Sequence, residues 1–140
     1  MPTALRVRTL SALGIGSASS GQYSSSDIYL LAKVIAAEAR GEPYIGQVAV
    51  GAVVLNRVQH ASFPDSIAGV VYQPGAFSCV NDSNWSTEPT AQSRKAAQDA
   101  INGWDPSGGA IYYYNPAKTS NKWIRTRPVI QTIGAHVFCK

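Results

Sequence analysis

Two glutamates near the end of an apolar segment, Glu38 and Glu42, are the residues of this sequence best suited to acid–base chemistry. Apolar residues at Ile28, Leu31 and Ile35 recur at helical spacing, so Glu38 is expected in the last turn of a helix, beside its apolar stripe. A carboxyl group in such surroundings is costly to ionise. It can therefore hold a proton at neutral pH and act as a general acid.

An ion pair is the structural alternative for Glu38, and spacing does not choose between the two. The candidate partners are three arginines, Arg40, Arg57 and Arg125. Glu42 follows the break at Gly41 and precedes Pro43, where a helix cap or an ion pair is its more ordinary role. Other carboxylates that could assist are Asp82, Glu88 and Asp105. Two-carboxylate glycosidases hold their pair about 5–5.5 or about 6.5–9.5 Å apart. The sequence does not fix such distances, so a single-carboxylate mechanism carries equal weight.

Histidine and cysteine give little support for metal or thiol chemistry. His60 and His136 have no metal-ligand spacing, and neither do Cys79 and Cys139, so we expect no metal and no cofactor. A cysteine paired with His136 is a weak candidate nucleophile, and no Gly-x-Ser-x-Gly elbow is present. The cysteines are open to two interpretations, a disulfide in an oxidising compartment or two buried free thiols.

The composition describes an ordinary globular chain. Its 140 residues suit one domain, and no apolar run reaches the roughly 18 residues of a membrane span. The net charge of +4 favours an anionic partner, but the lysines and arginines are scattered, so nucleic acid is not an expected partner. Residues 1–26 end in a Gly/Ser-rich stretch that predicts a flexible linker or an artificial chain end, followed by a domain over 27–140.

Capping and turn signals divide the domain into helices followed by strands. The first helix would be capped by Ser26 or Asp27 and stopped by Gly41. Further helices are expected over about 44–59, over 66–72, and from Thr87 or Glu88 through Asn102. Strand-like segments lie at 110–114 and 129–138, and residues 73–89 are expected to be irregular. This order predicts an α+β fold, mostly α, with a small antiparallel β element.

A series of motifs runs through residues 27–140. They are Ala36-Ala-Glu38-Ala-Arg-Gly-Glu42, Gly46-Gln-Val-Ala-Val-Gly-Ala-Val-Val-Leu-Asn56-Arg57, Phe63-Pro64, Ala76-Phe77-Ser78, Ala96-Ala97, Tyr113-Tyr114-Asn115-Pro116, Trp123-Ile124 and Ile133-Gly134-Ala-His136-Val-Phe138. Together they resemble the catalytic domain of the spore cortex-lytic enzymes, the germination-specific cell wall hydrolases.

The resemblance implies a lysozyme-like, Rpf-like domain that cleaves the β-1,4 bond between muramic acid and N-acetylglucosamine in spore cortex peptidoglycan containing muramic-δ-lactam. Such enzymes are lytic transglycosylases, and Glu38 falls on the family's catalytic glutamate. Protonated Glu38 would donate to the glycosidic oxygen. The resulting carboxylate would take the proton of the sugar's own C6 hydroxyl, which gives a 1,6-anhydro product without a second carboxylate or a metal.

In such an enzyme, aromatic and amide side chains would hold the glycan strand. The candidates are Gln73, Phe77, Tyr113, Asn115, Trp123 and His136. A core position for Tyr113, or a buried, hydrogen-bonded His136, is the structural alternative. The resemblance also implies a precursor with a signal peptide and a peptidoglycan-binding domain, secreted into the spore cortex or cell wall. We expect glycan strands as the partner, a regulatory protein in the dormant spore, and a monomeric chain.

Three other functions stay open at this point. The first is a hydrolytic muramidase on the same scaffold, with water as the acceptor. The second is a non-catalytic peptidoglycan-binding module. The third is an amidase or peptidase, which the lack of metal-ligand spacing disfavours.

Overall fold

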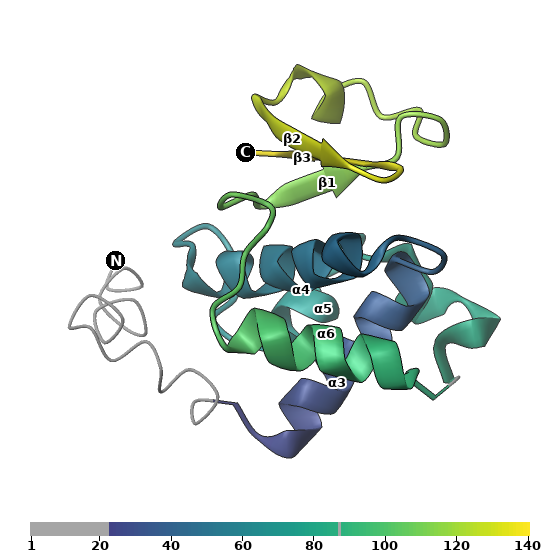
Figure 1. Ribbon diagram of the computed structural model, residues 1–140. Helices are drawn as coiled ribbons and strands as arrows, with labels where there is room; N and C mark the ends of the chain where they lie inside the picture. Colours follow the sequence, from purple (N-terminus) through teal and green to yellow (C-terminus); the bar gives the residue numbers. More distant parts are fainter. Residues whose placement is uncertain (1–22, 87) are drawn as a thin grey trace.

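In the computed structural model, which describes residues 23–86 and 88–140, a small sheet lies on a bundle of helices (Figure 1). The helices are α3 (Ser25–Glu38), α4 (Tyr44–Gln59), α5 (Ile67–Val71) and α6 (Ala91–Ile101). The strands are β1 (Tyr112–Tyr114), β2 (Val129–Ile133) and β3 (His136–Cys139). The predicted class, α+β and mostly α, is confirmed. The linker predicted for residues 1–26 falls mainly on residues 1–22, which lie outside the described part of the chain.

Helix α4 forms the centre of the core. Every residue from Gly46 to Val54 is buried, and the helix packs against both α3 and α6. Gly51 allows this close approach, because a Cβ atom there would lie 2.8 Å from Ile35 Cδ1 and 3.3 Å from Ala100 Cβ. The predicted contact of small residues on this helix with the first helix is therefore confirmed, although α4 is buried on all sides rather than along one face.

Capping hydrogen bonds set the helix starts, and two of these starts differ from the prediction. Helix α3 begins earlier than expected because Ser24, and not Ser26 or Asp27, is its N-cap. The Ser24 hydroxyl accepts from the Asp27 backbone N–H at 3.1 Å, and the Asp27 carboxylate accepts from the Ser24 N–H at 3.1 Å. Helix α6 begins later than expected because the Thr90 hydroxyl accepts from the Ser93 N–H.

The sheet has three antiparallel strands in the order β1-β3-β2. Residues 129–138, predicted as one strand, form two, since Gly134 adopts a φ of +57° and turns the chain back on itself. Strand β3 is central and pairs Phe138 with Tyr113 of β1. Strand β1 is the one next to α4 (Figure 1). The sheet thereby places Tyr113 over the helices.

Candidate active site

Glu38 is the last residue of α3, and a residue of the sheet holds its carboxyl group. The hydroxyl of Tyr113 donates to Glu38 Oε1 at 2.5 Å. Cys79, in the 3-10 turn η3 (Ser78–Asn81), makes a side-chain hydrogen bond to the same carboxyl. The side chain of Glu38 is half-buried. One of its oxygens is thus fixed by Tyr113, which leaves the other to exchange a proton with a ligand.

Both donors to Glu38 stay protonated at neutral pH. Burial, and then the nearby Glu38 carboxylate, raise the pKa of Tyr113 well above its ordinary range. Burial also raises the pKa of the Cys79 thiol to about 12, and Glu38 adds to this effect. Because neither donor ionises, both can stabilise the carboxylate that remains after Glu38 has given up its proton.

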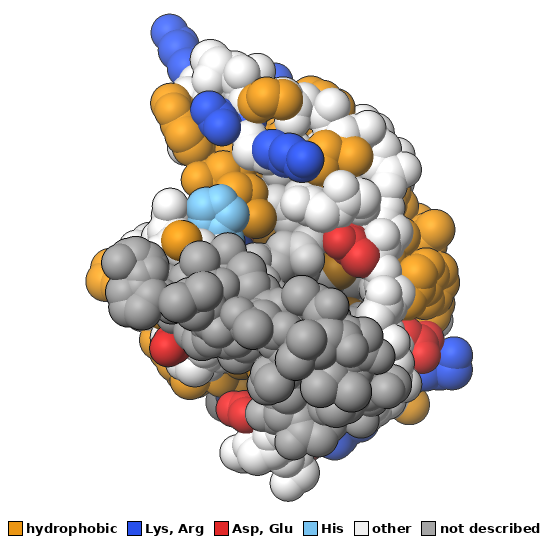
Figure 2. Space-filling view, turned by 90° about the vertical axis from the view of Figure 1, so that its left-hand side faces the viewer, with side chains coloured by type: hydrophobic (Ala, Val, Ile, Leu, Met, Phe, Trp, Pro, Cys, Tyr) orange, Lys and Arg blue, Asp and Glu red, His pale blue; other side chains and the backbone are white. Residues whose placement is uncertain are grey.

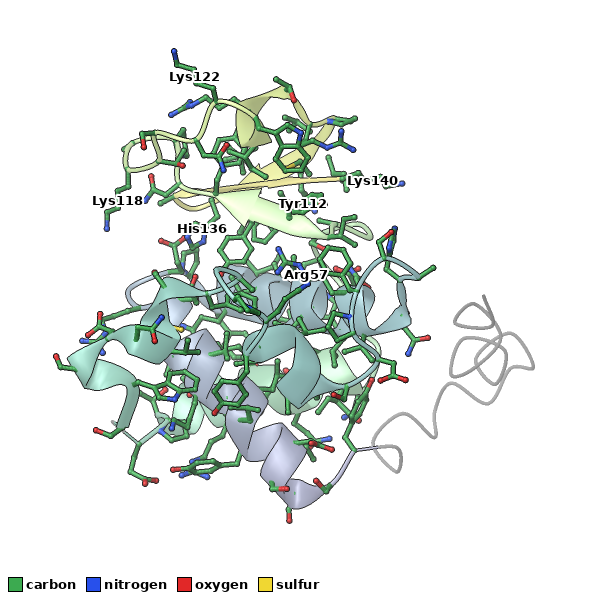
Figure 3. The ribbon with its side chains drawn as sticks, turned by 180° about the vertical axis from the view of Figure 1, so that it is seen from behind. Arg57, Tyr112, Lys118, Lys122, His136 and Lys140 are labelled. Carbon is green, nitrogen blue, oxygen red and sulfur yellow. The ribbon has the colours of Figure 1, made fainter. Side chains whose placement is uncertain are left out.

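A buried arginine lies close to this group. Arg57 of α4 is 8% exposed and donates from Nε to the Ile111 carbonyl at 2.7 Å. Its guanidinium lies 5.0–5.5 Å from the centroids of three rings, those of Phe63, Phe77 and Tyr112. Burial lowers the pKa of Arg57, while electrostatic interactions with Tyr113, Tyr112 and Glu38 oppose this shift. Figure 3 shows Arg57 between the helices and the sheet.

Glu42 faces the turn between β2 and β3 instead. Its Oε1 accepts from the Ala135 N–H at 3.0 Å and lies 3.9 Å from His136 Nδ1. Among the described residues, His136 Nδ1 has no hydrogen-bond partner. The His136 ring packs edge-on against Tyr113, with centroids 4.9 Å apart. Glu42 therefore anchors the hairpin whose His136 supports the Tyr113 ring.

A groove with a volume of about 320 Å³ opens beside Tyr113. We call it the aromatic groove; its lining includes Phe63, Gln73, Tyr112, Tyr113, Tyr114 and Trp123. Trp123 is 52% exposed and packs edge-on against Tyr112, with ring centroids 5.4 Å apart. Exposed rings with polar groups beside them form the kind of surface on which sugars stack. On the face shown in Figure 2, lysine and arginine side chains gather on the sheet side, which suits an anionic strand.

The side chains predicted to contact the glycan lie in different parts of the structure. Gln73, Tyr113 and Trp123 line the aromatic groove. Phe77, in contrast, is 3% exposed and lies in the core under Arg57. His136 is buried beside Tyr113, and Asn115 uses its Oδ1 to accept from the Ala117 N–H in the turn after β1. The contact of these side chains with substrate stays a prediction.

Other candidate groups have structural partners. Asp105 accepts from Asn56 and from the backbone of Ser107, and so fixes a turn. Glu88 accepts from Tyr29 and Arg94 at the surface. The two cysteines are free and buried, so the disulfide does not form. Across 23–86 and 88–140, no group of three His, Cys, Asp or Glu side chains could hold a metal ion. No helix in these ranges is long and apolar enough to cross a bilayer.

Comparison with known proteins assigns the chain to a family. The family described as Cell Wall Hydrolase matches residues 41–139, which is most of the chain. This chain belongs to the cell wall hydrolase family. Glu38 lies just before the matched segment, and the hairpin that supports Tyr113 lies within it.

The chain resembles spore cortex-lytic enzymes in particular. It is 54% identical over 118 residues to that of Bacillus cereus and 51% identical over 120 residues to that of Bacillus subtilis. The alignments cover 84% and 86% of this chain but 46% and 39% of the relatives, so the chain spans less than half of their length. The family resemblance seen in the sequence is confirmed.

Two solved structures share the fold of this chain. The catalytic domain of Bacillus cereus SleB superimposes with a TM-score of 0.80 at 54% identity, over 84% of this chain and 92% of that domain. The catalytic domain of the germination-specific lytic transglycosylase SleB from Bacillus anthracis gives a TM-score of 0.81 at 53% identity, and the match covers 84% of this chain and 97% of that domain.

Proposed function

We propose that residues 27–140 are the catalytic domain of a spore cortex-lytic enzyme that cleaves peptidoglycan as a lytic transglycosylase. The scissile bond would be the β-1,4 bond between muramic acid and N-acetylglucosamine. The observation that carries this proposal is the Glu38 carboxyl, held by two neutral donors beside an aromatic groove. The similarity to the Bacillus anthracis lytic transglycosylase supports it.

The reaction uses Glu38 twice. With Tyr113 bonded to Oε1, the carboxyl proton on the other oxygen passes to the glycosidic oxygen as the bond from muramic C1 breaks. The N-acetylglucosamine leaves with a hydroxyl group. The carboxylate, now stabilised by the hydrogen bonds from Tyr113 and Cys79, takes the proton of the muramic C6 hydroxyl. The C6 oxygen bonds to C1, and Glu38 is again protonated.

A single catalytic carboxylate fits the positions of the other acids. Glu42 is engaged by the β2–β3 turn, Asp105 by its own turn and Glu88 by surface partners. The alternative is a hydrolytic muramidase, and the position of Asp82 favours it. Asp82 and Cys79 line the same depression, and Cys79 contacts Glu38, so Asp82 is the acid to consider as a base for water.

Product analysis distinguishes the two reactions. Purified cortex fragments are digested, and the released glycans are separated and weighed by mass spectrometry. Transglycosylation leaves 1,6-anhydromuramic ends, whereas hydrolysis leaves reducing muramic ends that are heavier by one water. Reducing ends that disappear with Asp82→Asn would establish the muramidase. Intact glycan strands with released stem peptides would establish an amidase instead.

The proposed substrate also sets the expected location and partners. Cortex peptidoglycan lies outside the cytoplasmic membrane, so we propose an extracytoplasmic enzyme made as a precursor with a signal peptide. The binding domain, a regulatory partner in the spore and the monomeric state are further parts of this proposal. Support comes from the relatives, of which this chain spans less than half.

A further inference from the structure

A second hollow lies along one side of α3, the helix that ends at Glu38. It consists of two depressions, of about 180 and 220 Å³, that share Ala37, Arg40 and Trp85. We call it the α3 hollow. Its wall includes Cys79, whereas the wall of the aromatic groove includes Tyr113. Both residues interact with the Glu38 carboxyl, so the hollow and the groove each have one wall residue in contact with it.

Helix α3 lines this hollow with two small residues between two cations. Lys33, Ala36 and Ala37 lie on one face of the helix, at positions i, i+3 and i+4, and Arg40 follows just after its end. The alanines leave room in front of the backbone. The Lys33 ammonium lies 4.3 Å from the centroid of the Trp85 ring, which holds it in place.

Arg40 is the cation that is free for a ligand. Its side chain is exposed and, within 23–86 and 88–140, makes no hydrogen bond or ion pair. Two acids share the lining, but Glu88 is bonded to Tyr29 and to Arg94 at 3.3 Å, and Asp82 has contacts of its own. Thr90 and Gln92, in the first turn of α6, add the positive end of that helix dipole.

The size and charge of the α3 hollow together indicate its ligand. Each depression is smaller than the roughly 300 Å³ at which ligand pockets begin, so a short substituent fits better than a further pair of sugars. In a peptidoglycan strand, muramic acid differs from N-acetylglucosamine by its lactyl group. Except in muramic-δ-lactam, where it is closed into a ring, this group ends in a carboxylate, either its own or that of an attached peptide.

We propose that the α3 hollow binds the carboxylate-bearing lactyl substituent of a muramic residue, with Arg40 as its principal cation. This inference rests on the proposed function. A glycan strand has two alternating β-1,4 bonds, and a shift by one sugar would present the wrong one to Glu38. Because only muramic acid carries the substituent, binding it beside Glu38 sets the register of the strand. Arg40 is then a residue that determines specificity.

The experiment measures kcat and KM on three sets of matched glycan strands. The first set carries stem peptides. The second has been stripped by an amidase and carries free lactyl carboxylates. The third is the stripped set with its carboxylates converted to neutral methylamides. The enzymes are the wild type, Arg40→Gln, Arg40→Glu and the control Lys140→Gln, which removes an exposed positive charge at the far end of the sheet (Figure 3).

We expect Arg40→Gln to raise KM about tenfold on strands with carboxylates, the loss typical of a charge-assisted hydrogen bond, and Arg40→Glu to raise it more. On the methylamide strands neither variant should differ from the wild type. An effect on stripped strands alone identifies the free lactyl carboxylate, an effect on peptide-bearing strands alone identifies a carboxylate of the stem, and an effect on both shows that the hollow accepts either carboxylate. Equal effects on charged and neutral strands, or no effect, would overturn the inference. A wild type that cleaves no strand would instead contradict the proposed function.

Discussion

Tyr113 and Glu38 lie 75 positions apart in the chain, and their side chains meet in a hydrogen bond of 2.5 Å. This contact joins the sheet to the end of the first described helix, so the acid is positioned only when both parts of the fold are in place. Strand β1 supplies the hydroxyl, and the β2–β3 hairpin supports the ring through His136. The catalytic group is therefore sensitive to residues far from it in sequence.

Replacing Tyr113 by phenylalanine should slow cleavage without unfolding the protein. The ring and its packing stay, but the donor to Glu38 Oε1 is lost. Hydrogen bonds to charged groups contribute about 1.5–3 kcal/mol, which corresponds to a fall in kcat of roughly 10- to 150-fold. The rate of release of soluble glycan from cortex fragments measures this. The matched control is Tyr29→Phe, which removes a surface hydroxyl bonded to Glu88; equal losses in both variants would contradict a special role for Tyr113.

The Cys79 thiol should be unreactive in the folded protein and replaceable by serine. Its pKa of about 12 leaves almost no thiolate at pH 8, so alkylating reagents should not inactivate the enzyme. Cys79→Ser keeps a donor to Glu38 and should keep activity, whereas Cys79→Val should lower kcat. Titration of the unfolded chain should find both cysteines as free thiols. Finding no free thiol in the absence of reductant would show that the two cysteines form a disulfide.

The buried His136 should make stability depend on pH. Burial lowers its pKa below the ordinary 6.5, against the opposing influence of Glu42. A histidine that is harder to protonate in the folded state contributes stability that is complete above pH 6.5 and is lost as the pH falls through its folded pKa. The midpoint temperature of thermal unfolding should thus decrease as the pH is lowered from 7 to 5. The decrease should be smaller in His136→Gln. If the exposed-site variant His60→Gln weakens this dependence equally, the effect does not come from His136.

Gly134→Ala should destabilise the hairpin more than an equally strained glycine elsewhere. Gly134 has a φ of +57°, and a Cβ there would approach Glu42 and lie 2.9 Å from Pro43 Cδ. Gly75 has a φ of +76° and nothing within 4 Å of such a Cβ, so Gly75→Ala isolates the backbone strain. Overpacking should add about 1–3 kcal/mol to the loss in Gly134→Ala, as measured by denaturant unfolding. Equal losses of unfolding free energy in the two alanine variants would show that the contact between Glu42 and the hairpin is loosely packed.

Local patterns in the sequence predicted much of the fold. The bounds of α4, the short helix α5 within 66–72 and the position of Glu38 in the last turn of α3 all follow from periodicity and capping chemistry. The predicted start of α3 was wrong, because Ser24 and Asp27 form a capping box that begins the helix earlier. Several serines lie nearby, which makes the position of this capping box hard to recognise in the sequence. The third strand was missed because Gly134 turns a segment that reads as one continuous strand.

The contacts around Glu38 were less predictable, because they join distant segments. Nothing in the sequence near Cys79 indicates that its thiol meets Glu38, and Arg57 follows Asn56 in what reads as a polar helix end. Arg57 is buried because three rings from separate segments surround it. Phe77 was expected to line the groove, yet its side chain is one of those rings and lies in the core.

The most direct test compares Glu38→Gln with Glu42→Gln on cortex fragments, with product masses as the readout. The amide introduced at position 42 keeps an oxygen for the Ala135 N–H, so Glu42→Gln should still release 1,6-anhydro products at a rate near that of the wild type. A glutamine at position 38 cannot donate and recover the proton, so Glu38→Gln should lose at least about a hundredfold in rate while remaining folded. Undiminished cleavage by folded Glu38→Gln would contradict the assignment of Glu38 as the catalytic acid.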